Sequence, residues 1–191
     1  NLYNFFVAIP YISILVIPIF CIKPSGSSYD DFVPIGRLKM IVFNWLSICV
    51  QFVAMLLPLM LVPFCVNLFG AVDFGQVFAS FFMILLYGLA SCSIGIFFYY
   101  LFLSNTISFI FTALVLALSN VLHLLMEYFS NVSLISFVVK LFSFSWHFDS
   151  ASKGIIDSRD IVYFILVAAF FIFLTFIVYE KKIGKIFAFS Q

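Results

Sequence analysis

Apolar residues gather along the chain in five runs, separated by short polar intervals. A helix needs roughly 20 residues to cross a hydrocarbon core of about 30 Å, and all five runs approach or exceed that length. The runs cover residues 5–22, 40–66, 77–102, 107–126 and 161–179. This pattern predicts an all-α, polytopic membrane protein in which residues 1–191 form a single transmembrane domain.

Prolines lie inside the first two runs, which makes these spans irregular. The first run is short and holds Pro10 and Pro18, and the second holds Pro58 and Pro63. Proline removes a backbone donor, so a membrane helix tolerates it where neighbouring helices bind the freed carbonyl. We expect the second run, which is longer than a crossing needs, to kink or tilt near Pro58 and Pro63.

The outer segment 127–160 comes just before the last run and contains the longest polar interval of the chain, 143–160. Its apolar piece, 134–144, is too short to cross, so we expect it to dip into the membrane and return or to lie flat on it. Gly154 should break the backbone, and Asp157 or Ser158 should cap the last helix. We predict an outer gate or re-entrant element here, comprising Trp146, His147, Phe148, Gly154 and Asp157.

Composition supports a protein embedded in lipid. Hydrophobic residues make up 65% of the chain and charged residues only 9%, against roughly a quarter charged in soluble domains. A net charge of +1 gives no reason to expect a nucleic-acid partner. The four cysteines all lie inside apolar runs without a CxxC pair, so we interpret them as small apolar residues.

The distribution of lysine and arginine predicts the orientation. Six of them would be cytoplasmic if the loop 23–39 and the C-terminal tail lie inside, and three would lie outside. We therefore expect a multi-pass membrane protein with a cytoplasmic C-terminus. Five spans then place Asn1 outside, and because no signal peptide precedes it we expect a six-helix parent with one further helix upstream.

Motifs for familiar chemistry are missing from the sequence. It contains no GxxxxGK followed by Ser or Thr, no HExxH and no GxSxG, so we expect no ATPase and no enzyme in this chain. Asn120, His123 and Glu127 share one helix face and could form a polar lining or proton relay. The alternative is a solvated cluster at a helix end. Two ligands on one helix do not make a metal site.

Small residues repeat at helical spacing in the third run. Gly88 with Cys92, and Ser91 with Gly95, form small-xxx-small pairs that allow another helix to approach closely. We interpret them as helix-packing residues. They could also mediate packing between two copies of the chain.

The interval 23–39 is the only substantial loop on the expected cytoplasmic side. Ser27 or Ser28 can cap a short turn with Asp30 and Asp31 near its start, and Pro34 would end it. An apolar side on this turn would let it lie on the membrane or dock on another protein. A plain solvated connector is the alternative.

The interval before the last helix resembles a family signature. Phe142-Ser143-Phe144-Ser145-Trp146-His147-Phe148, then Gly154 to Asp157 as GxxD, then Arg159 to Phe164 as RDxxYF, are similar to type-2 ABC transporter permeases of the gliding-motility branch. The turn Gly70 to Gly75 and the following helix also look like that family. The element expected after the second family helix is degenerate here, with Lys23 in place of an arginine.

The resemblance implies an exporter permease in a bacterial-type inner membrane. Such a subunit forms a substrate path with a second permease copy or a paralogue, among membrane lipids, and is driven by separate ABC ATPase subunits that hold ATP and magnesium. The residues implied for ATPase coupling are Tyr29, Asp30, Asp31 and Phe32. Two other readings stay open: a membrane scaffold or accessory subunit, and an intramembrane enzyme using His123 and Glu127. The substrate is not implied.

Overall fold

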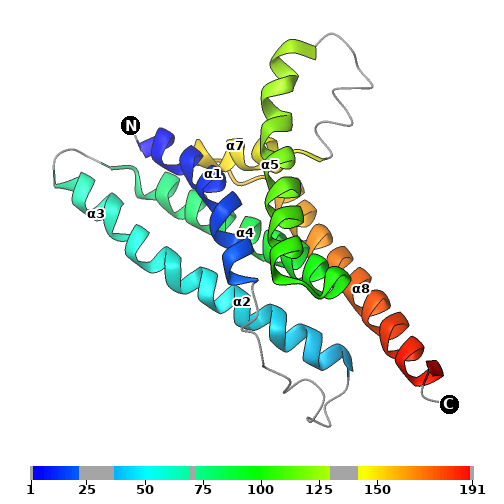
Figure 1. Cartoon of the computed structure of the whole chain (residues 1–191). Coiled ribbons are helices and arrows are strands. Elements are labelled where there is room, and N and C mark those ends of the chain that lie inside the picture. The colour runs from blue at the N-terminus through cyan, green and yellow to red at the C-terminus, as the bar shows by residue number, and fades with distance from the viewer. Residues whose placement is uncertain (1, 22–36, 69–71, 130–141, 190–191) are drawn as a thin grey trace.

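The computed structural model describes residues 2–21, 37–68, 72–129 and 142–189, with side chains over 4–21, 38–68, 72–122 and 142–181. All regular structure in these ranges is helical (Figure 1). The helices are α1 (Leu2–Phe20), α2 (Arg37–Leu59), α3 (Leu61–Asn67), α4 (Phe74–Phe102), α5 (Asn105–Phe129), α7 (Phe144–Ser152) and α8 (Ser158–Phe189).

Four helical stretches in the described residues are long and apolar enough to cross a membrane. They are Leu38–Asn67, Phe74–Phe102, Asn105–Leu122 and Ser158–Lys181. The all-helical, multi-pass class expected from the sequence is therefore confirmed. The apolar stretch of α1, Asn4–Phe20, is shorter, so its crossing stays a prediction.

Successive long helices run back and forth between two ends of the bundle (Figure 1). The start of α4, the start of α8 and the short helix α7 lie at one end, which we call the α7 end. The last turns of α4 and α8 lie at the opposite end. Only Leu103 and Ser104 separate α4 from α5, and Leu103 closes α4 with a left-handed backbone (φ 53°) and a 2.9 Å bond from its N–H to the Tyr99 carbonyl.

The second span is interrupted near its prolines. Helix α2 ends at Leu59 and α3 begins at Leu61, with Met60 between them as a turn residue whose N–H still bonds to the Leu56 carbonyl at 3.2 Å. Pro63 cannot donate to the Leu59 carbonyl four residues earlier, which accounts for the break at this point. Met60 keeps helical angles (φ −64°, ψ −21°), and α3 continues in nearly the direction of α2 (Figure 1).

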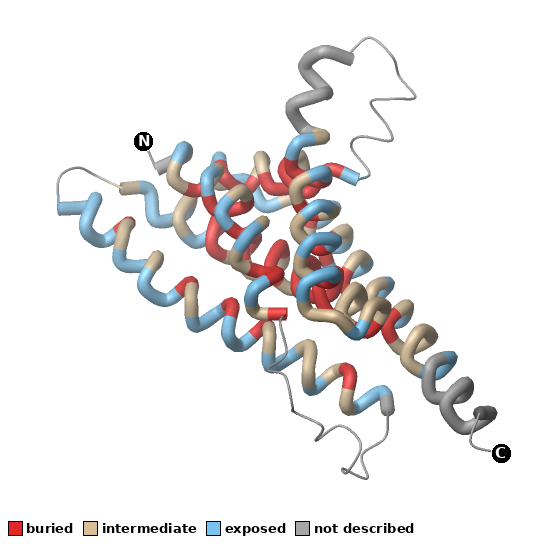
Figure 2. Tube along the Cα trace, in the orientation of Figure 1, coloured by how far each residue is buried: buried red, intermediate tan, exposed pale blue. Residues whose placement is uncertain are grey.

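Helix α4 forms the centre of the bundle. In its most apolar window 72% of the residues are buried, against 17–22% in the other three candidate spans. It contacts α1, α2, α5, α7 and α8. The outward faces of α2, α3 and α8 stay exposed, as expected of helices facing lipid (Figure 2).

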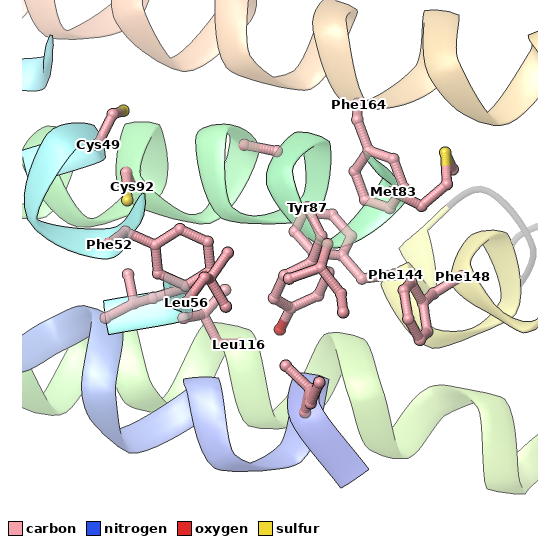
Figure 3. Close-up of a cluster of buried hydrophobic side chains, with 14 of the residues drawn as sticks. Cys49, Phe52, Leu56, Met83, Tyr87, Cys92, Leu116, Phe144, Phe148 and Phe164 are labelled. Carbon is pink, nitrogen blue, oxygen red and sulfur yellow. The ribbon is translucent and has the colours of Figure 1, made fainter. Parts of the chain in front are cut away.

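Two glycines allow α1 and α2 to approach α4 closely. A Cβ at Gly88 would collide with the ring of Phe52 on α2, and a Cβ at Gly95 would collide with the Cys21 sulfur just after α1. Figure 3 shows Phe52 pointing into this cluster beside Leu56 and Cys92. Ser91 and Cys92 are fully buried. The small-residue faces are therefore used inside this chain, and our expectation that they pair two copies is wrong for the Gly88 and Gly95 faces.

Several sequence-based boundaries shift in the structure. Arg37 begins α2, so the last three residues of the expected loop 23–39 are helical. The interval 127–160 likewise contains the end of α5, all of α7 and the first residues of α8. The expected coupling residues Tyr29, Asp30, Asp31 and Phe32 lie outside the described residues, as do 134–141 of the apolar piece.

We predict that Gly88→Ala lowers the stability of the folded bundle by about 1–3 kcal/mol, because the added methyl group overpacks the Phe52 ring. Thermal melting in detergent measures the loss. Adding Phe52→Leu should recover part of it, since the smaller side chain makes room. A double variant whose loss equals or exceeds the sum of the two single losses would contradict this contact.

Candidate functional site

The short helix α7 lies across the α7 end of the bundle and is mostly buried. Ser143 precedes it with an extended backbone, and its hydroxyl accepts a hydrogen bond from the Trp146 N–H at 3.3 Å, a typical N-cap. Phe144, Phe148 and Ala151 point into the core with at most 4% of their surface exposed. The apolar side of α7 thus fixes it against the spans.

A buried hydrogen bond between two side chains joins α7 to the start of α8. His147 Nδ1 lies 2.6 Å from Asp160 Oδ1, and both side chains are almost fully buried. The Tyr163 ring, one turn along α8, stacks on the imidazole with centroids 3.8 Å apart and planes at 18°. Burying the Asp160 charge is costly, and a hydrogen-bonded imidazole offsets that cost. We call His147, Asp160 and Tyr163 the α7–α8 clamp.

The link between the two helices turns sharply so that the clamp can close. Gly154 has φ +86°, a left-handed conformation that other residues adopt only with strain. It also packs against Gln76, where a Cβ would lie 3.3 Å from the Gln76 Cα. Asp157 then caps α8 by accepting a 2.9 Å bond from the Arg159 N–H. The cap at Asp157, the break at Gly154 and the place of Asp160 in the first turn are all confirmed.

Side chains of α4 bind the free end of α7. A helix leaves its last carbonyls without partners inside the helix. Gln76 Nε2 donates to the Ser152 carbonyl at 2.6 Å, and Ser80 Oγ donates to the Ala151 carbonyl at 3.1 Å. The central helix therefore holds α7 by polar contacts, while the clamp ties α7 to α8.

A second polar cluster lies deeper in the bundle, around the fully buried Tyr87 of α4. Its hydroxyl accepts from Ser13 Oγ of α1 at 3.0 Å and from Asn120 Nδ2 of α5 at 3.1 Å, and it lies 3.3 Å from the Pro10 carbonyl, to which it can donate. Figure 3 shows the hydroxyl between these helices. One hydroxyl thus joins three helices.

Aromatic packing connects the two clusters. The Tyr87 ring meets Phe144 of α7 at 5.7 Å and Phe164 of α8 at 6.1 Å, both edge to face. Phe144 also meets Tyr163 of the clamp at 5.9 Å. A displacement of α7 would therefore disturb the packing around Tyr87.

The expected site residues fall into different places. Asn120 belongs to the Tyr87 cluster, and its Oδ1 is buried without a hydrogen bond in the described part of the chain. His123 and Glu127 lie on α5, but their side chains are outside the described set, so their role stays a prediction. His147 and Phe148 are buried beside the spans and Trp146 is half-buried, while a gating role for them is untested.

Ser13, Tyr87 and Gln76 are residues that sequence reasoning did not single out. Serine and tyrosine are common in membrane helices, and nothing in their spacing marks a contact between helices distant in sequence. The spacing of Asp160 and Tyr163 is a signal that could have placed them on a shared helix face, since residues three apart are neighbours on a helix. It could not show that His147 would complete it.

An apolar cavity of about 230 Å³ lies between α2, α4 and α8. It is lined by Trp45, Leu86, Leu89, Phe164, Ile165, Ala168, Ala169 and Ile172. Such a lining suits a hydrocarbon chain and offers no polar recognition. No group of three or more metal-ligating side chains occurs among the described residues.

We predict that His147→Ala destabilises the bundle by about 3 kcal/mol, because the Asp160 carboxylate is left buried without its partner. Detergent melting measures the loss, and increased maleimide labelling of a Ser145→Cys reporter shows whether α7 is released. Lys153→Ala, at the C-cap immediately after α7, is the matched control. Lys153 is 53% exposed and pairs with Asp149, so its loss should cost at most about 1 kcal/mol. Equal losses of stability for His147→Ala and Lys153→Ala would show that the α7–α8 clamp does not hold α7 in place.

We predict that Tyr87→Phe costs about 0.6 kcal/mol, and at most about 1.7 kcal/mol, for each hydrogen bond lost, as is typical of hydrogen bonds between membrane helices. A double-mutant cycle with Asn120→Ala should show coupling between the two sites, because both changes remove the same 3.1 Å bond. Strictly additive losses would show that this bond contributes nothing.

Compared with known protein families, with curated proteins and with solved structures, the chain finds no match in any of the three.

Proposed function

We propose that this chain is the permease subunit of an ABC exporter, working with a second permease and with separate cytoplasmic ATPase subunits. The observation that carries the proposal is the clamp. The residues on which the resemblance to type-2 ABC permeases rests, among them Ser143, His147, Gly154, Asp157 and Asp160, meet in one compact arrangement. A motif whose members all serve one local structure is harder to ascribe to chance than scattered matches.

The position of that arrangement suits an exit gate. The clamp lies at the α7 end, and the apolar part of α4 separates it from the end where α8 continues toward the basic tail. If the basic tail is cytoplasmic, as the lysines predict, α7 covers the outer side of the bundle. Release or shift of α7 would then open the side from which an exported substrate leaves.

Helix α4 connects the expected cytoplasmic end of the bundle, where an ATPase would act, to the α7 end, where the substrate would leave. Its 29 residues span about 43 Å. Near its last turn, the Tyr100 hydroxyl accepts a 2.7 Å bond from Asn44 of α2, and the Tyr100 ring packs on Tyr179 of α8 at 5.3 Å. At its first turns it holds α7 through Gln76 and Ser80. A rigid helix bound at both ends moves them together, which supports a rocking mechanism driven from the cytoplasmic side.

The ATPase would supply what this chain lacks. With no P-loop in its sequence, the chain needs a partner that binds ATP and magnesium and converts hydrolysis into movement. We propose that the loop containing Tyr29, Asp30, Asp31 and Phe32 receives this input. Two carboxylates there would pair with basic side chains of the partner.

Purification of the natural complex from membranes under mild detergent tests the proposal. We predict that a P-loop ATPase copurifies, and that replacing both carboxylates (Asp30→Lys with Asp31→Lys) leaves the assembly intact but separates ATP hydrolysis from transport. Reversing two charges removes the attraction that would transmit the movement.

Lys181→Ala, a change at the last exposed residue of α8 whose side chain is described, is the control and should leave coupling unchanged. A complex without any nucleotide-hydrolysing companion would favour the scaffold. Loss of a chemical activity in His123→Ala with normal assembly would favour the intramembrane enzyme.

A further inference from the structure

One polar side chain faces the lipid at mid-depth of the second span. Gln51 is exposed on α2, with 13 residues between it and the start of the Leu38–Asn67 span and 16 to its end. At 1.5 Å per residue the amide lies roughly 20 Å or more from either end, too far for the side chain to reach water. A primary amide without a partner in hydrocarbon costs several kcal/mol.

The other amides inside the described spans show how unusual this is. Away from helix ends, the described spans hold three amide side chains. Asn44 donates to the Tyr100 hydroxyl at 2.7 Å, and Asn120 donates to the Tyr87 hydroxyl and the Leu116 carbonyl. Gln51 makes no hydrogen bond within the described structure. Its partner must therefore come from outside the helices described.

The neighbours of Gln51 on its helix face suit a close helix contact. Ser47, Ala54 and Pro58 lie one or two turns away on the same face, and all are exposed. Small side chains let two membrane helices approach until their polar groups meet. Pro58 also has no N–H for the Ala54 carbonyl four residues earlier, so an acceptor is freed one turn from the Gln51 amide.

We propose that this face of α2, defined by Ser47, Gln51 and Ala54, is where two copies of the chain pair in the membrane, through hydrogen bonds between their Gln51 side chains. A primary amide carries both donors and an acceptor, so it complements an identical copy of itself. Two copies inserted with the same topology are related by an axis along the membrane normal. A residue near that axis then meets its own copy at the same depth.

The proposal names a pairing face for the permease pair and to that extent rests on the proposed function. It also assigns different packing contacts to different helix faces of the molecule. The Gly88 and Gly95 faces pack helices within the chain, while the exposed face of α2 packs a second copy. Self-association is measured without any ATPase, so failure of the transporter proposal and failure of this one are distinguishable.

Cysteine cross-linking in liposomes tests the face directly. The exposed native thiol is removed as Cys65→Ser, while the other three cysteines are buried and are kept. Gln51→Cys should give a disulfide-linked dimer with copper phenanthroline as oxidant. Val53→Cys, at nearly the same depth, 41% exposed but on the opposite side of α2, is the matched control and should give little.

Energy transfer between labelled copies in the same liposomes measures the contribution of the amide. Gln51→Leu should weaken self-association about three- to tenfold, whereas Gln51→Asn, which keeps an amide, should stay within about twofold of the natural chain. An unchanged melting temperature of the leucine variant shows that folding is intact.

Three results would overturn the proposal. The first is an equal yield of cross-linked dimer for Gln51→Cys and Val53→Cys. The second is cross-linking of Gln51→Cys to a different polypeptide. The third is a natural chain that stays monomeric when the ratio of lipid to protein is lowered.

Discussion

The burial of α4 is the constraint on which the rest of the structure depends. Lipid tails are as apolar as the helix surfaces, so membrane helices gain little from hydrophobic association and must pack closely instead. In this chain Gly88 and Gly95 bring Phe52 and Cys21 directly onto the α4 backbone. The other long helices then arrange themselves around α4 and keep their outward faces for lipid.

Buried polar groups determine which helices pack together and how each helix is rotated. A hydroxyl or amide inside hydrocarbon needs a partner, so each such group restricts which helices can be neighbours and at what rotation. The hydrogen bonds of the Tyr87 hydroxyl restrict how α1, α4 and α5 can be rotated about their own axes. The bond between Asn44 and Tyr100 restricts the rotation of α2 relative to α4 in the same way. Gln51 obeys the same rule only if its partner lies outside the described helices.

The α7 end illustrates how a short helix becomes part of a membrane bundle. Nine residues form too short a helix to be stable in isolation. Helix α7 is held because its start is capped by Ser143, its last carbonyls are bound by α4 and its imidazole is paired with α8. These contacts come from three parts of the chain, so movement in any one of them reaches the other two.

Local features of this protein were determined by the sequence alone. The apolar runs predicted the spanning helices, and the cap at Asp157 and the break at Gly154 followed from side chains acting on neighbouring backbone. Contacts between helices were decided only by the tertiary structure. The clamp of His147 with Asp160 and Tyr163, the Tyr87 cluster and the use of Gly88 inside the chain all depend on how each helix is rotated. In helices apolar on all sides, the residue pattern does not fix that rotation, because any face can meet lipid or a neighbour at similar cost.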